Sequence, residues 1–337
     1  MANARPRSND VTVGNRDVAL LKSATIGRGP ISDVAVDGDT VVTANFGDDS
    51  VAVLGADTLA LRGGVVAGQP TAVSIVGDRA FAAVSSASYD ALVVIDTASG
   101  EVVGEFPLSF NVTAIATSTD GKRVYAGRAG EEGVDVAVVD VHAERVGTIF
   151  IAKDADATID ALCLDATGRR LYVGVSDSRS SRLLTVDVET ARVRGALEIG
   201  APIRGVALGM DSTAYVLTSD IVDGGVLYVV DLVANQITAD VSVAAAPTQL
   251  VLSADGARAY VVDYDHVAVV DVEHRTVVAG VSVGARPSAI ALGGERLVVA
   301  DYDGGVTTYT VAAGAPMLYA PFDAAALPAP RELEPAV

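Results

Sequence analysis

The chain of 337 residues has a single cysteine and no tryptophan. One cysteine, Cys163, excludes an internal disulfide. No run of about 18 apolar residues occurs, so the sequence predicts no transmembrane helix and no direct insertion into a membrane. The first residues, Met1 to Arg7, lack the apolar core of a secretory signal. We therefore expect a cytoplasmic protein.

Positive charge is also scarce. The formal net charge is −19, and the lysines are Lys22, Lys122 and Lys153. The arginines are scattered along the chain and form no basic run. A polyanion such as nucleic acid is bound mainly through clustered positive charge, so the composition argues against a nucleic-acid partner. An anionic membrane surface is disfavoured for the same reason.

What the sequence does have is a sevenfold repeat. Each repeat is a short apolar stretch, a turn, a second apolar run and a third run that mostly ends in aspartate. Repeats of about 40 to 50 residues built from short strands predict a β-propeller with one blade per repeat. The turns are Asp37-Gly38, Gly77-Asp78, Asp120-Gly121, Thr167-Gly168, Asp211-Ser212, Asp255-Gly256 and Gly293-Gly294.

The fold class that follows is all-β, with seven four-stranded antiparallel blades. The last repeat lacks an outer strand, whereas residues 18–26 form an unassigned apolar stretch near the beginning. We expect residues 18–26 to complete the seventh blade and to remove the open sheet edges. The predicted organisation is an N-terminal extension (1–17), the propeller (18–313) and a Pro/Ala-rich C-terminal tail (314–337).

The repeat core resembles the YVTN-repeat β-propeller family. The resemblance is clearest in the segment that begins at Pro247 and passes through Ser253-Ala254-Asp255-Gly256 to Tyr260-Val261-Val262-Asp263. It covers roughly residues 18–311, but most repeats keep only the Tyr-Val part of the signature. The resemblance implies the fold and carries over no catalytic residue. Members include surface, binding and scaffold proteins, and related propellers include sugar lactonases.

When the seven repeats are aligned on the first apolar residue of each inner strand, here called the anchor, the residue two positions before it is polar in every repeat. These seven residues form a polar column. Alternation along a strand would place it on the same side as the anchor, around one mouth of the central channel. Two interpretations stay open. In the first, the hydroxyls only form hydrogen bonds with backbone groups and channel water, and Asp160 and Arg204 neutralise each other as an ion pair. In the second, the column lines a polar pocket for a small ligand. The column consists of Ser32, Thr71, Thr113, Asp160, Arg204, Thr248 and Ser288.

A second group of candidates lies in the loops between second and third strands. These loops are acidic and also carry aromatic and arginine side chains, which are common anchors of protein interfaces. The alternative is that they are solvated turns. The candidates for a partner-binding rim are Phe46, Tyr89, Arg128, Arg179, Arg182, Tyr264, His266 and Tyr302.

Signals for metal binding and catalysis are weak. Asp301-Tyr302-Asp303-Gly304 is similar to the start of a calcium loop, but Ala312 stands where an EF-hand has glutamate. Calcium held by carboxylates from several blades remains an alternative; otherwise we expect no metal and no cofactor. His266 is the histidine on the candidate rim, with no identifiable nucleophile beside it. We therefore expect no catalytic residues.

The sequence favours a non-enzymatic protein-interaction scaffold, or an accessory subunit of a larger assembly, that binds through the loop face. We expect a monomer with a protein partner. A membrane-protein complex at a bacterial cell envelope is an elaboration that rests on the family resemblance. Two alternatives stay open: a small-ligand site at the channel mouth, and a metal-dependent hydrolase similar to the lactonases.

Overall fold

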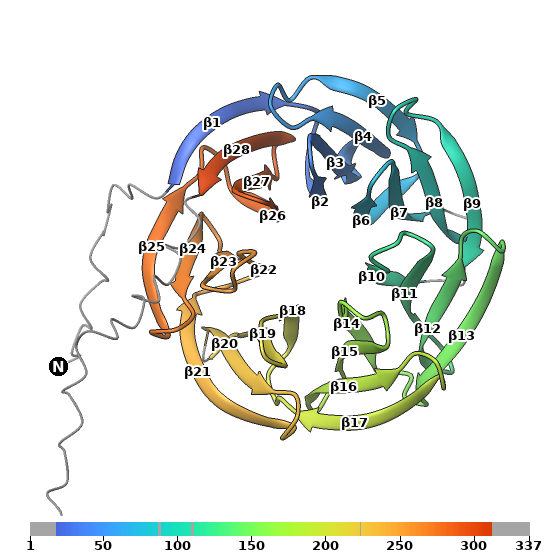
Figure 1. Ribbon diagram of the computed structural model, residues 1–337, viewed down its shortest axis with the longest axis vertical. Coiled ribbons are helices and arrows are strands. Elements are labelled where there is room, and N and C mark those ends of the chain that lie inside the picture. Colours follow the sequence, from blue (N-terminus) through green and yellow to red (C-terminus); the bar gives the residue numbers. More distant parts are fainter. Residues whose placement is uncertain (1–17, 87–88, 109–110, 223, 312–337) are drawn as a thin grey trace, which may run out of the picture.

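The computed structural model describes residues 18–86, 89–108, 111–222 and 224–311. Its strands form seven four-stranded antiparallel sheets, arranged as blades around a common centre (Figure 1). The predicted seven-bladed propeller is confirmed. The N-terminal extension 1–17 and the tail 314–337 lie outside the described residues.

Six blades are built from consecutive strands, innermost first. Blade 1 contains β2 (Ile31–Asp37), β3 (Thr40–Asn45), β4 (Ser50–Gly55) and β5 (Leu61–Val66), with a 3₁₀ turn, η1 (Phe46–Asp48), between β3 and β4. Blade 2 contains β6 (Gln69–Val76), β7 (Arg79–Ser85), β8 (Asp90–Asp96) and β9 (Val102–Leu108). Blade 3 contains β10 (Val112–Thr117), β11 (Arg123–Gly130), β12 (Gly133–Asp140) and β13 (Arg145–Ala152).

The next three blades repeat this order. Blade 4 contains β14 (Thr158–Leu164), β15 (Arg170–Ser176), β16 (Ser181–Asp187) and β17 (Arg192–Glu198). Blade 5 contains β18 (Ile203–Leu208), β19 (Thr213–Asp220), β20 (Gly224–Asp231) and β21 (Gln236–Ala244). Blade 6 contains β22 (Gln249–Leu252), β23 (Arg258–Val262), β24 (His266–Asp271) and β25 (Thr276–Ser282).

Blade 7 joins the two ends of the described chain. Its inner strands are β26 (Pro287–Gly293), β27 (Arg296–Asp301) and β28 (Gly305–Val311), and its outer strand is β1 (Val18–Thr25). β1 pairs with β28 from Val18 opposite Val311 to Thr25 opposite Gly305. The predicted closure by residues 18–26 is confirmed, and it covers the edge of β28 that does not pair with β27.

The core lies between neighbouring blades, because both faces of each sheet are covered. Ile31 and Leu54 of blade 1 pack with Val298 of blade 7 in one cluster. On the other side of blade 1, Val42 and Val53 pack with residues of blade 2. This arrangement explains why the strands are rich in valine and alanine throughout and why two-residue alternation is weak.

The loops divide the ring into two faces. The candidate face carries the loops between second and third strands and the links from each outer strand to the next inner strand. The turn face carries the turns between first and second strands, such as Asp37-Gly38, where Gly38 has φ of 55°. Glycine adopts such positive φ values without a steric penalty, which explains why glycine occurs at this position of the turn.

Candidate functional site

Three side chains from blades 6 and 7 form an exposed stack on the candidate face. The Arg286 guanidinium carbon lies 4.2 Å from the centre of the Tyr302 ring and 5.3 Å from the centre of the Tyr264 ring. Both distances are within the range of cation–π attraction. The Tyr302 backbone N–H also donates to the Arg286 carbonyl, at 3.1 Å. The stack therefore holds a cation and two aromatic rings in a fixed arrangement.

The two tyrosines of the stack stay accessible to a partner. The exposed fraction is 62% for Tyr264 and 39% for Tyr302. The hairpin that carries Tyr264 is anchored by buried Asp263, which accepts bonds from the Ala245 and Ala246 backbone N–H groups. The rings are thus presented by anchored loops, which reduces the entropy lost on binding.

Further exposed apolar side chains occur on the same face. Phe46, in η1 of blade 1, is 38% exposed, and Tyr89 of blade 2 is 41% exposed and donates its hydroxyl to Glu105. Ile221 and Val222, in the loop between β19 and β20, are almost fully exposed. The aromatic members of the predicted rim therefore lie on an arc of blades 6, 7, 1 and 2, and Ile221 and Val222, which the prediction did not include, extend this arc to blade 5.

The arginines of the predicted rim lie elsewhere, on blades 3 and 4. Arg128 makes a two-pronged ion pair with Asp135, at 2.7 and 3.0 Å. Arg182 pairs with Asp177 at 3.3 Å, and the Arg179 backbone N–H donates to the same carboxylate. Only 12% of the Arg128 side chain is exposed. The structure thus does not bring these arginines together with the tyrosine stack.

The polar column before the inner-strand anchors coincides with irregularities in strand pairing. In six blades the register shifts at this position, so a β-bulge interrupts the strict alternation that we expected there. Ser32 and Thr71 each donate to a carbonyl of the next blade, and Thr113 does the same to Ile159. For these three residues the contacts favour the interpretation that the hydroxyls satisfy backbone groups.

The charged members of the column do not form the ion pair that this interpretation included. Asp160 accepts a bond from the Thr158 hydroxyl at 2.8 Å, and no ion pair joins it to Arg204 among the described residues. Of the remaining members, Thr248 precedes β22 and Ser288 has a buried hydroxyl without a partner in the described part of the chain.

A pair that the sequence interpretation missed lies at the centre of the ring. Gln249 of blade 6 donates its side-chain amide to Asp33 of blade 1, at 2.9 Å. Burial raises the pKa of Asp33 to about 6, although N–H groups of Val73, Gln249 and Val34 act in the opposite direction. The sequence does contain a signal for this pair. The residue directly before the anchor is alanine or glycine in the other five blades, and Asp33 and Gln249 are the two exceptions.

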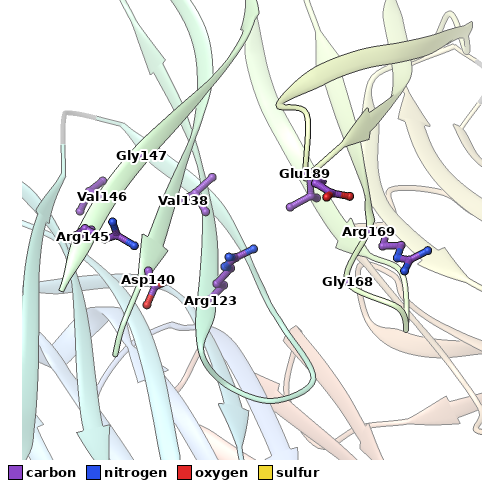
Figure 2. Close-up of a pocket in the computed structure, with 10 residues that line it drawn as sticks. Arg123, Val138, Asp140, Arg145, Val146, Gly147, Gly168, Arg169 and Glu189 are labelled. Atoms are coloured by element: carbon purple, nitrogen blue, oxygen red, sulfur yellow. The ribbon is translucent and has the colours of Figure 1, made fainter. Parts of the chain in front are cut away.

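The turn face carries a groove of about 720 Å³ between blades 3 and 4 (Figure 2). Arg123, Asp140 and Arg145 lie on the blade 3 side, and Arg169 and Glu189 on the blade 4 side. Strand register places Arg123 opposite Asp140 and Asp140 opposite Arg145. The same Arg–Asp–Arg row recurs in blade 4 at residues 170, 187 and 192. The row is therefore a product of the repeat, and no predicted site residue lines the groove.

The other candidate groups make local contacts. His266 Nδ1 lies 2.8 Å from Asp265, and Asp301 accepts bonds from the backbone N–H groups of Asp303 and Gly305. No group of three or more His, Cys, Asp or Glu side chains within the described ranges is arranged to hold a metal ion. In the same ranges no helix has the length and apolar character needed to cross a membrane.

Comparison with known proteins places the chain near mycobacterial propellers. It is 47% identical over 197 residues to a seven-bladed beta-propeller protein of Mycolicibacterium smegmatis, a match that covers 58% of this chain and 53% of that protein. It is 29% identical over 324 residues to the seven-bladed beta-propeller protein Rv1057 of Mycobacterium tuberculosis, covering 84% of this chain and 82% of that protein. No family model matches the chain.

Among solved structures, hydrazine synthase of Kuenenia stuttgartiensis contains a similar chain. The TM-score is 0.75 at 16% identity, over 90% of this chain and 99% of that one. At this level of identity the likeness concerns the fold alone.

Proposed function

We propose that the protein is a non-enzymatic interaction scaffold that binds a protein partner through the candidate face. The observation that carries the proposal is the exposed stack of Tyr264, Arg286 and Tyr302. Tyrosine and arginine are enriched among the residues that dominate interface energetics, and exposed apolar side chains that gather on one face mark interaction sites. The stack is also pre-organised, because three loops converge on it.

The partner that fits this face combines an apolar contact segment with basic flanks. Phe46, Ile221 and Val222 extend the apolar surface beyond the stack. The Asp265 side chain, next to Tyr264, is 77% exposed. With a net charge of −19, the protein attracts a basic partner at long range, so association slows as salt is added.

The test is affinity capture of the tagged full chain from gently solubilised bacterial cells, with quantitative mass spectrometry of soluble and membrane fractions. The test variant is Tyr264→Ala, Tyr302→Ala. A matched control is Met210→Ala, Val233→Ala, which removes two exposed side chains of blade 5 on the turn face. Circular dichroism and thermal melting verify that both variants keep the fold.

A partner captured in stoichiometric amounts by the native protein and the control, and lost with the tyrosine variant, supports the proposal. Equal capture by all three proteins contradicts the choice of face. The lack of a stoichiometric partner in both fractions contradicts the scaffold function itself.

A further inference from the structure

The residue just before each inner-strand anchor is small in five blades and long and polar in two. The long residues are Asp33 in β2 of blade 1 and Gln249 in β22 of blade 6. Blades 1 and 6 are not neighbours, since blade 7 lies between them (Figure 1). The full column is Asp33, Ala72, Ala114, Ala161, Gly205, Gln249 and Ala289.

The two exceptions are bonded to each other across blade 7. The Gln249 amide nitrogen donates to Asp33 Oδ1 at 2.9 Å, and Gln249 Oε1 accepts the Ile290 backbone N–H at 2.6 Å. Asp33 Oδ2 accepts the Val73 backbone N–H at 2.9 Å. These bonds form a continuous chain through blades 6, 7, 1 and 2. Ala289, the blade 7 member of the column, is fully buried beside it.

The position of these hydrogen bonds matters because blade 7 contains strands from both ends of the described polypeptide. Its outer strand, β1, is exposed along most of its length, and Leu20 and Leu21 are 64% and 48% exposed. A strand that buries little apolar surface separates from its sheet at a low free-energy cost. The pairing of β1 with β28 therefore depends more on hydrogen bonds between the two strands than on buried apolar surface.

We infer that Asp33 and Gln249 act as a latch that keeps the ring closed across blade 7 independently of β1. The loss of one partner leaves the other polar group buried and unsatisfied, which costs more free energy than the bond itself contributes. The latch ties blade 6 directly to blade 1, so separation of β1 alone does not free blade 7 from its neighbours. Loss of the latch makes ring opening at blade 7 easier than opening at any other blade.

Hydrogen–deuterium exchange of the full chain tests the latch. Gln249→Met keeps the length of the side chain and removes both hydrogen bonds. We expect exchange of amides in β1 and β26–β28 to become at least about tenfold faster, with blades 3 and 4 unchanged. The matched control is Thr113→Val, which removes the bond from blade 3 to the Ile159 carbonyl and keeps the side-chain shape. It should leave blade 7 as in the native protein.

Two results would overturn the inference. One is unchanged exchange in blade 7 of Gln249→Met; the other is an equal increase in all seven blades, which would mean general destabilisation. If Gln249→Met does not fold, Gln249→Asn serves instead, because it keeps the amide but shortens its reach to Asp33. The same pattern of exchange is expected there, and uniform exchange again contradicts the latch.

Discussion

Replacing Asp33 by asparagine should abolish a pH dependence of stability that the native protein shows between about pH 4 and pH 7. The carboxyl lies at the centre of the ring, where surrounding protein replaces much of its hydration. Burial raises its pKa from 3.8 to about 6, against the opposing effect of three N–H donors. Because asparagine does not titrate, the variant isolates this single group.

The charged groups around Asp33 do not account for the shift. The elements packed against β2 are β3, β6, β26, β27 and η1, and β22 supplies Gln249. Of these six elements, only β27 and η1 carry charged side chains among the described residues. Arg296 pairs with Asp57, Asp301 accepts backbone N–H bonds within its own loop, and Asp48 accepts the Arg28 N–H.

Proton linkage gives the sign and the size of the expected change in the free energy of unfolding with pH. The folded state binds the Asp33 proton more tightly than the unfolded state, because the folded pKa is higher. The stabilisation is therefore complete below about pH 4 and is lost as the pH rises through about 6. A shift of about two units corresponds to about 3 kcal/mol in the free energy of unfolding, at about 1.4 kcal/mol per unit.

The assay is urea unfolding followed by circular dichroism at several pH values from 4 to 7, for both proteins. The difference in free energy of unfolding, native minus variant, should fall by about 2 to 3 kcal/mol over this range. Subtraction removes the contribution of the many surface carboxylates that both proteins share. A difference that is constant, or that grows with pH, would refute the reasoning.

Three further predictions concern the core, the cysteine and a backbone position. Phe81 is fully buried between blades 2 and 3, so Phe81→Ala should lower the free energy of unfolding by about 3 to 5 kcal/mol in urea titrations. Burial raises the pKa of Cys163 to about 11, so alkylation by iodoacetamide at pH 8 should be about 100-fold slower in the native protein than in urea. Gly133 has φ of 130° and an added Cβ would collide with the Ala152 carbonyl, whereas Gly168 has φ of 70° and open space. Gly133→Ala should therefore lower the melting temperature more than Gly168→Ala.

The architecture could be predicted from sequence because its signals are local and repeated. Each turn, such as Asp37-Gly38, marks a hairpin without knowledge of any other blade. The closing strand was also predictable, because the seventh repeat lacks an outer strand and residues 18–26 supply one. The structure places this strand at Val18–Thr25.

The candidate sites were less predictable because their contacts join loops of different blades. Tyr264 and Tyr302 stand out in the sequence as aromatic residues in acidic loops, but Arg286 lies in a link between blades 6 and 7 that gave no signal by itself. The β-bulges at Ser32 and its counterparts depend on how two strands pair, which the hydrophobic pattern of one strand does not specify. Gln249 and Asp33 could have been found by comparing the column before the anchors across all repeats.

Blade 7, which combines β1 with β26–β28, also determines how the ring responds to a pulling force. Val18 and Val311 are opposite each other at one end of the β1–β28 pair, so the two described ends of the chain lie side by side. A force that separates these ends loads the hydrogen bonds of the pair one after another, as in a zipper, because those bonds lie across the strands. Tension applied through the ends would therefore peel β1 away at low force, whereas tension applied between other blades would load several bonds at once.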